Sequence, residues 1–421
     1  MNRIRLFASC LVLGLATSAI ALASGCGEAA PSVSEFDQAA TTDASTPFEP
    51  PAPDFPDSAT ETPLDPDALL AASCANAKND ANRAPVYMLF VLDGSGSMNQ
   101  SGKWQAVVPA LHAIFDELKK ADDPSFAAGL TIFADLADPT ITDTSAGPYD
   151  KMDVPVRFVD GSQLTALKSR LDNTSPYLGT PTYEVLDGQY KLLRAFTPAA
   201  PVLAGGKKFV VFITDGVPDP DMPAGENEGP GSLLLAQAAH ALPAPEGPID
   251  TFVIGTGPFP NPADGGVSYS PEFCGQLAVA GGTRASATCN PSETANASNA
   301  CFFQVTPPAS GSPSQAEVDA LRQKFIDAIN TIRTRALPCE YALKKTVDGG
   351  TGIVDPTKLN VIYTSGAGAR TLVPGDATNG WTVDDPSDPT KVLLHGKACE
   401  TAKADPAGKM LVVVGCKTVL K

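Results

Sequence analysis

The sequence predicts an α/β fold: a doubly wound, mostly parallel sheet with helices on both faces, followed by a small β-rich C-terminal module. Three observations support this prediction. Apolar runs alternate with amphipathic segments over residues 74–338. Those runs are nearly continuous, as strands covered on both faces require. After Pro338 the pattern changes to short apolar runs separated by turn signals such as Asn379-Gly380.

The position of each strand and helix is predicted from the local pattern of apolar residues. The apolar runs predict strands at residues 86–92, 126–133, 154–159, 209–214, 250–255 and 301–305. Helical spacing of apolar residues predicts helices at 103–120, 163–171, 182–196, 232–242 and 314–337. For the C-terminal module, residues 339–421, we expect strands at 359–364, 370–373, 381–383, 391–395 and 409–415, with a short helix at 398–404.

The first 25 residues predict an export signal. Arg3 and Arg5 precede a short apolar stretch that ends in the small residues Ala23-Ser24-Gly25 before Cys26. This ending resembles a bacterial lipobox, although Ala23 stands where Leu is commonest, and the resemblance implies cleavage before Cys26 and a lipid on its thiol. Gly27, rather than Asp, follows the cysteine, which in such lipoproteins favours the outer membrane. The alternative is ordinary cleavage that releases a soluble exported protein.

Residues 26–73 are expected to form a disordered acidic tether. Between Gly27 and Ser73 the chain has ten acidic residues and no Lys or Arg, and it is rich in Pro and Ala. Such a composition cannot bury enough apolar surface to offset the entropy cost of ordering. The formal net charge of the whole chain is -17, which argues against nucleic acid as a partner.

The strongest functional signal is the polar turn Asp93-Gly94-Ser95-Gly96-Ser97, directly after the strand predicted at 86–92. Carboxylate and hydroxyl oxygens on a glycine-loosened turn are ligands for a hard divalent cation such as Mg²⁺. The strand predicted at 209–214 ends in Thr214-Asp215-Gly216, and Thr180 lies between the two segments on a loop that enters a helix. Because ligands of open α/β sheets bind beyond the carboxyl ends of the strands, these groups are expected to meet.

These three segments, in this order, resemble the metal-ion-dependent adhesion site of von Willebrand factor type A domains. The family pattern is Asp-x-Ser-x-Ser, then a Gly/Thr loop, then a strand ending in Thr-Asp-Gly. The resemblance implies that the metal ligands are Asp93, Ser95, Ser97, Thr180 and Asp215. Thr182 is the weaker candidate for the threonine, since it fits the first helical turn or the N-cap position better. The implied ion is Mg²⁺, with Mn²⁺ and Ca²⁺ as alternatives.

The resemblance also implies a function. A site built mainly from neutral hydroxyls leaves positive charge and open coordination positions on the ion, and a carboxylate from a partner can complete the shell. We therefore expect a cell-envelope lipoprotein that binds a protein or glycan partner through the metal. The alternative is a scaffold subunit of an envelope complex that uses the metal structurally. The sequence indicates no oligomeric state.

The sequence gives little support for an enzyme. It contains three histidines, no Gly-x-Ser-x-Gly turn and no His-Glu-x-x-His motif. The loop Asp215-Gly216-Val217-Pro218-Asp219-Pro220-Asp221 carries spare carboxylates, which either hold a second cation or form a solvated rim beside the site.

The nine cysteines fit an exported protein. Cys289 and Cys301 bracket a polar insertion and are expected to form a local disulfide. The ends of a type A domain lie close together in that family, which implies a clasp between Cys74 and Cys339. A pair of Cys399 and Cys416 in the C-terminal module would leave Cys274 as the odd thiol.

Overall fold

The structure is a computed structural model that describes twelve parts of the chain. These are residues 65–71, 77–134, 149–177, 179–218, 228–258, 269–309, 311–343, 346–347, 350–351, 355–405, 408–414 and 418. The predicted signal, Cys26 and most of the predicted tether lie outside these ranges. The described part of the tether contains the helix α1 (Pro66–Ala71), whose Leu69 is buried in a cluster with Ile362 and Val413, so the expected disorder is wrong for these residues. Within the described ranges, no helix combines the length and the apolar character needed to cross a membrane.

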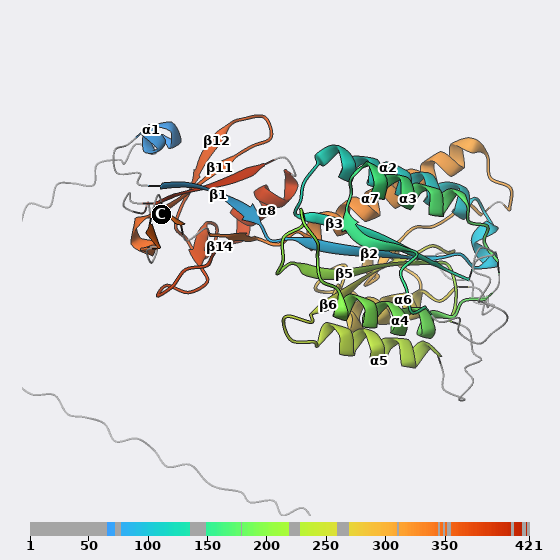
Figure 1. Ribbon diagram of the computed structural model, residues 1–421. Helices are drawn as coiled ribbons and strands as arrows, with labels where there is room; N and C mark the ends of the chain where they lie inside the picture. Colours follow the sequence, from blue (N-terminus) through green and yellow to red (C-terminus); the bar gives the residue numbers. More distant parts are fainter. Residues whose placement is uncertain are drawn as a thin grey trace, which may run out of the picture. The chain divides into compact units, whose positions relative to one another are not determined.

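The described chain contains a six-stranded sheet flanked by helices (Figure 1). Its strand order is β4-β3-β2-β5-β6-β7, and every neighbouring pair is parallel except β3 with β4. The strands are β2 (Val86–Asp93), β3 (Phe126–Phe133), β4 (Val154–Phe158), β5 (Lys207–Thr214), β6 (Ile249–Gly255) and β7 (Phe303–Gln304). All six strands were predicted, and the mostly parallel arrangement confirms the predicted fold class.

Helices cover both faces of this sheet (Figure 1). One face packs against α2 (Lys103–Ala121), α3 (Gly161–Asp172) and α7 (Gln315–Ala336). The other face packs against α4 (Thr182–Ala195), α5 (Glu228–His240) and α6 (Pro271–Ala280). Because each face has its own apolar core, every residue of β2 and β3 is buried, which explains their continuous apolar sequences.

Helix α6 was not predicted, although its start carries a readable signal. The side chain of Ser270 caps the helix by accepting a hydrogen bond from the backbone N–H of Phe273, and Pro271 occupies the first turn. Gly275 interrupts the helical pattern of the sequence. It is required because a Cβ at this position would lie 2.3 Å from the carbonyl oxygen of Pro291.

A second sheet has seven strands, all paired antiparallel, in the order β12-β11-β15-β1-β8-β14-β13. Its strands are β1 (Ala77–Arg83), β8 (Glu340–Ala342), β11 (Leu359–Thr364), β12 (Arg370–Val373), β13 (Trp381–Val383), β14 (Lys391–Leu394) and β15 (Lys409–Val414). Smaller elements are α1 (Pro66–Ala71), α8 (Gly396–Ala404), β9 (Thr346–Val347), β10 (Gly350–Thr351) and the 3₁₀ helices Gly96–Asn99, Ala297–Asn299 and Pro356–Lys358. The five strands expected here after residue 358 are present, and so is the short helix.

Strand β1 was not predicted, and it lies in the seven-stranded sheet between β15 and β8. A segment that precedes the six-stranded sheet in the chain thus pairs with strands that follow it. The predicted domain limits at residues 74 and 338 stay predictions.

The disulfides correct two of the expected pairs. Cys289 and Cys301 form the expected local disulfide. Cys339, however, is bonded to Cys399, so the expected pairing of Cys339 with Cys74 and of Cys399 with Cys416 is wrong. The reason is strand pairing: the backbone N–H of Leu394 donates to the carbonyl of Cys339, which brings the start of α8 beside Cys339. Cys74 and Cys416 lie outside the described residues, and Cys274 is a buried free thiol.

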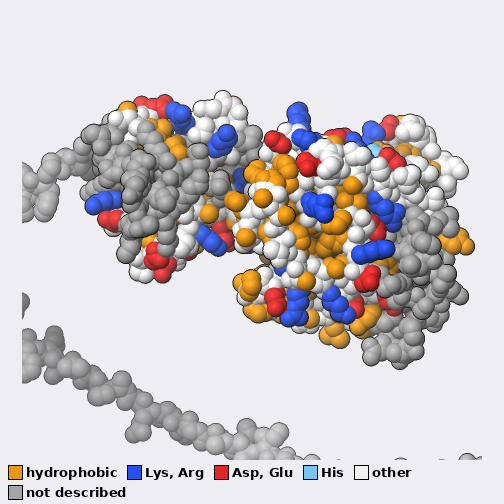
Figure 2. Space-filling model, viewed as in Figure 1, with side chains coloured by type: hydrophobic (Ala, Val, Ile, Leu, Met, Phe, Trp, Pro, Cys, Tyr) orange, Lys and Arg blue, Asp and Glu red, His pale blue; other side chains and the backbone are white. Residues whose placement is uncertain are grey.

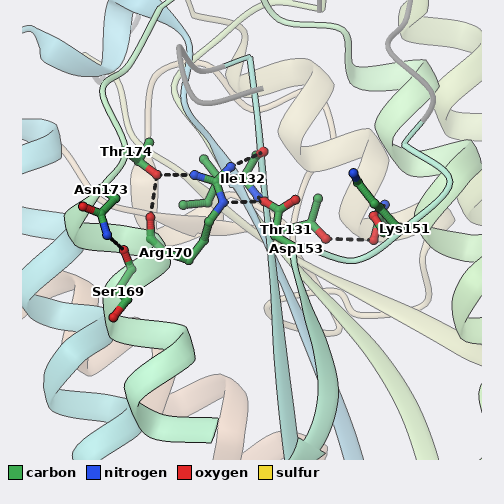
Figure 3. A network of polar contacts seen from close by, with 9 residues as sticks. Thr131, Ile132, Lys151, Asp153, Ser169, Arg170, Asn173 and Thr174 are labelled. Carbon is green, nitrogen blue, oxygen red and sulfur yellow. Dashed lines mark hydrogen bonds and ion pairs between the residues drawn. The ribbon is translucent and has the colours of Figure 1, made fainter. Parts of the chain in front are cut away.

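A polar network braces the end of β3, where β4 no longer pairs with it (Figure 3). A carboxylate oxygen of Asp153 accepts from the backbone N–H of Ile132 at 2.9 Å and from Nε of Arg170 at 2.8 Å. Arg170, on α3, also donates to Thr174. These side chains satisfy backbone groups that a longer β4 would otherwise pair, so β3 stays regular to Phe133.

On the face shown in Figure 2, Lys/Arg and Asp/Glu side chains are intermixed.

Candidate metal centre

Two adjacent strands of the six-stranded sheet each end in a carboxylate. Asp93 is the last residue of β2, and Asp215 follows the last residue of β5. The two strands are parallel neighbours, and Leu92 pairs with Ile213. The chain winds from β2 towards β3 on one side and from β5 towards β6 on the other, so the acids lie where the winding reverses. Both side chains are buried, with residue exposures of 0% for Asp93 and 1% for Asp215.

The turn after β2 orients its hydroxyls by short-range hydrogen bonds. Oδ1 of Asp93 accepts from the backbone N–H of Ser95 at 2.8 Å, which folds the turn back over the carboxylate. The backbone N–H of Gly94 donates to the carbonyl of Phe133, fixing the exit from the strand. The turn then continues as the 3₁₀ helix Gly96–Asn99, and Oγ of Ser95 lies 3.0 Å from Oγ of Ser97.

Two side-chain hydrogen bonds join the segments that follow β2 and β5. Oγ of Ser97 donates to Oδ1 of Asp215 at 2.8 Å. The hydroxyl of Thr214 donates to Oδ2 of Asp93 at 2.6 Å and accepts from the backbone N–H of Gly216. Four of the five expected ligands, Asp93, Ser95, Ser97 and Asp215, therefore form one connected cluster.

Thr180, the fifth expected ligand, lies against the residue after Asp215. A Cβ built on Gly216 would stand 2.7 Å from Oγ1 of Thr180, so only glycine allows this approach. Thr180 is buried and precedes the N-cap of α4, Pro181, by one residue. Thr182 is the first residue of α4, and its backbone N–H and hydroxyl both donate to the carbonyl of Thr180. That position matches the helical role expected for Thr182.

Burial and mutual repulsion make it costly for both carboxylates to be ionised. Burial, followed by the negative charge of Asp215, raises the pKa of Asp93 to about 7. Burial also raises the pKa of Asp215, and the ammonium of Lys103 opposes that rise. Two buried carboxylates this close are costly when both are ionised unless a cation lies between or beside them.

The donor set fits a hard divalent cation. It consists of two carboxylates and three hydroxyls, all oxygen ligands of the kind that Mg²⁺ and Mn²⁺ accept. Among the described residues, no group of three or more His, Cys, Asp or Glu side chains is placed to hold a metal ion.

The sequence pattern missed several residues around this cluster. Lys103 forms an ion pair with Asp215, and no motif indicated it. Thr214 was recognised only as part of the strand ending, although it donates to Asp93. Burial raises the pKa of the Cys274 thiol on α6, and the charges of Asp215 and Asp93 raise it further.

The family model described as the von Willebrand factor type A domain matches residues 88–257. This part of the chain is a von Willebrand factor type A domain. The match contains Asp93, Ser95, Ser97, Thr180 and Asp215. The residues of the acidic loop from Asp219 to Asp221, considered above for a second cation, lie outside the described residues.

Solved structures with a similar fold include a pilus adhesin and two proteins that hold a metal ion. The pilus adhesin SpaC of Lactobacillus rhamnosus GG is 14% identical, with a TM-score of 0.40, over 80% of this chain and 40% of SpaC. The manganese-loaded TRAP protein of Plasmodium vivax is 18% identical, with a TM-score of 0.34, over 59% of this chain and 76% of its own. Proximal thread matrix protein 1 of the mussel byssus, with a zinc-occupied MIDAS motif, is 12% identical, with a TM-score of 0.32, over 63% and 50% of the two chains.

This chain thus spans well under two thirds of the length of SpaC. A search of curated proteins gave no significant match.

Proposed function

We propose that the type A domain binds a divalent cation through Asp93, Ser95, Ser97, Thr180 and Asp215, and that it uses the cation to bind a carboxylate on a protein or glycan partner. The observation that carries this proposal is the pair of buried, mutually repelling carboxylates at adjacent strand ends, tied to Ser95 and Ser97 by hydrogen bonds. Mg²⁺ is the proposed ion, with Mn²⁺ and Ca²⁺ as alternatives.

The arrangement of the ligands favours binding to a partner. Three of the five ligand side chains are neutral hydroxyls, so the two carboxylates are the only negative charges among them. When bound, the cation supplies positive charge and a coordination position that a partner carboxylate can fill. Ser97 and Thr214 hold the two carboxylates in place without adding charge. A purely structural metal would be better served by a fully charged ligand set.

The proposed role is binding and not catalysis. Each of the chain's three histidines contacts a residue outside the candidate site: His112 lies 3.2 Å from Asp172, His240 2.6 Å from Asp250, and His395 2.7 Å from Thr382. No histidine base therefore serves the Asp93 and Asp215 cluster, which supports the assignment to ligand binding.

We also propose that the chain is a cell-envelope lipoprotein, anchored to the outer membrane through a lipid on Cys26. The lipobox-like sequence before Cys26 and the acidic segment of residues 26–73 support this location. The tether would hold the type A domain away from the membrane surface.

Metal binding is tested first, by isothermal titration of Mg²⁺ and Mn²⁺ into the purified full chain and into its Asp93→Asn and Asp215→Asn variants. Binding at a single site, lost in both variants, is the expected result. The control is Asp116→Asn, because Asp116 is an exposed acid of α2 paired with Lys168 and should leave binding unchanged. Equal binding by Asp215→Asn and wild type would contradict the proposal.

Partner binding is tested by a pull-down from envelope extract in Mg²⁺ or EDTA, with wild type and Asp215→Asn as baits. A partner retained by wild type in Mg²⁺ and released by EDTA is expected. A partner retained equally in EDTA would favour the scaffold alternative.

A further inference from the structure

A lysine lies at the carboxylate pair, contributed by the type A domain itself. Lys103 is the first residue of α2 and is only 8% exposed. Its ammonium donates to Oδ2 of Asp215. The side chain thus brings a full positive charge into a buried site that is otherwise lined by acids and hydroxyls.

The backbone before α2 fixes the position of this lysine. Gly102, the N-cap residue, has a left-handed φ of +73°, and a Cβ there would lie 2.9 Å from Pro313 and 3.0 Å from Val318 of α7. The backbone N–H of Lys103 donates to the carbonyl of Gln100, closing the turn that leads from Ser97 into the helix. The backbone at Gly102 is therefore packed against Pro313 and Val318, which fixes the start of α2, and from there the side chain of Lys103 reaches Asp215.

Hydrogen-bond donors hold both carboxylates in place. Asp93 is satisfied by the backbone N–H of Ser95 and by the hydroxyl of Thr214. Asp215 is satisfied by the hydroxyl of Ser97 and by Lys103. Among the donors named here Lys103 is the charged one, and its ammonium offsets part of the negative charge of the pair.

We propose that Lys103 is a built-in counter-ion that competes with the divalent cation for Asp215; this inference rests on the proposed function of the same site. An ammonium and a divalent cation that share one carboxylate repel each other strongly in a buried environment. Lys103 therefore stabilises the protein when divalent ions are scarce and weakens the binding of the metal. The lysine sets the concentration of metal at which the site becomes competent to bind a partner.

The test compares the full chain with Lys103→Met, which keeps the length and apolar stem of the side chain but removes its charge. In EDTA, the melting temperature of Lys103→Met should fall by at least about 3 °C, the shift expected from roughly 1 kcal/mol. In titrations with MnCl₂, the dissociation constant should fall at least tenfold. The rise in melting temperature on adding Mn²⁺ should therefore be larger than for wild type.

Two further variants act as controls. Lys103→Arg keeps the charge and should retain most of the stability in EDTA. Lys119→Met removes an exposed lysine from the other end of α2 and should change neither quantity. If Lys103→Met does not fold, Lys103→Gln, which keeps a hydrogen-bond donor without a charge, takes its place.

Weaker Mn²⁺ binding by Lys103→Met would overturn the proposal, because it would make the lysine a support for the metal. Unchanged melting temperature and unchanged affinity would overturn it too. If Mn²⁺ binds to neither wild type nor variant, the proposed function and the competition both fail, while a lowered melting temperature in EDTA would still support the counter-ion role.

Discussion

The two sheets of this protein use their residues differently. In the six-stranded sheet, β5 buries seven consecutive residues, Lys208 to Thr214, because helices cover both faces. In the seven-stranded sheet, β14 alternates between partly exposed and buried residues, with Val392 and Leu394 buried and Lys391 and Leu393 partly exposed. Parallel strands with two buried faces leave only their ends free for polar chemistry, and the candidate site lies at two such ends.

The two sheets also differ in how their strands are distributed along the chain. The six-stranded sheet is built from a continuous stretch of chain between β2 and β7, whereas the seven-stranded sheet joins β1, which precedes it, to strands that follow α7. The polar segment of β1 has little strand propensity of its own and is a strand because β15 and β8 pair with it.

The largest loss of stability is expected in β5, where consecutive residues are buried on opposite faces of the six-stranded sheet. Phe212 packs in one core, stacked on Phe133, and Ile213 packs in the other. Phe212→Ala and Ile213→Ala should each lower the free energy of unfolding, by about 3–5 and 2–5 kcal/mol. Leu393→Ala in β14 should cost less than about 1.5 kcal/mol, because Leu393 is already partly exposed. Guanidinium chloride unfolding measures all three.

The chain's two tryptophans allow each sheet to be followed separately. Trp104 lies in α2, over the six-stranded sheet, and Trp381 lies in β13. In a Trp381→Phe background, the fluorescence of Trp104 should report unfolding around the six-stranded sheet. In a Trp104→Phe background, the fluorescence of Trp381 should report unfolding of the seven-stranded sheet. A cost for Leu393→Ala equal to that for Ile213→Ala would contradict the distinction between the sheets.

The next largest effect concerns the two disulfides. Replacing Cys339 and Cys399 by Ala should lower the stability reported by Trp381 by about 2–4 kcal/mol, because the bond closes a separation of 60 residues next to β8 and α8. The matched control replaces Cys289 and Cys301, whose bond lies near β7, and should shift mainly the transition of Trp104. Coincident transitions in every variant would mean that both sheets unfold as one cooperative unit.

Much of the larger sheet could be predicted because its elements carry strong local signals. The apolar runs of β2, β3, β5 and β6 are long and bounded by polar turns, and the order of the three ligand segments placed the candidate site. Helix α6 was missed because Gly275 interrupts its pattern, although Ser270 and Pro271 mark its start. The glycine is needed because the carbonyl oxygen of Pro291, a residue outside the helix, leaves no room for a Cβ there.

Lys103 could not be predicted for a similar reason. At the start of an amphipathic helix, a lysine is ordinarily a solvated charge, and no local pattern indicates that this one lies beside Asp215. The Cys339–Cys399 bond likewise depends on the pairing of β8 with β14, which no short motif specifies. Contacts between segments far apart in the chain were the ones that sequence patterns could not supply.

The smallest change in stability, with a large effect on metal binding, is expected at Gly216. An added Cβ would lie 2.7 Å from Oγ1 and 2.9 Å from Cγ2 of Thr180, so Gly216→Ala must push the threonine loop away from Asp215. Stability should fall by about 1–3 kcal/mol, the usual cost of overpacking, while the affinity for Mn²⁺ should fall at least tenfold.

Gly161→Ala is the matched control for Gly216→Ala. A Cβ at Gly161 meets nothing within 4 Å, and Gly161 opens α3, where alanine is the better helix former. It should leave Mn²⁺ binding unchanged and stability equal or slightly higher. If Gly216→Ala kept full affinity, Thr180 would not be a ligand. The metal ligands would then come only from the segments that follow β2 and β5. The two sheets would still differ in the burial of their strands.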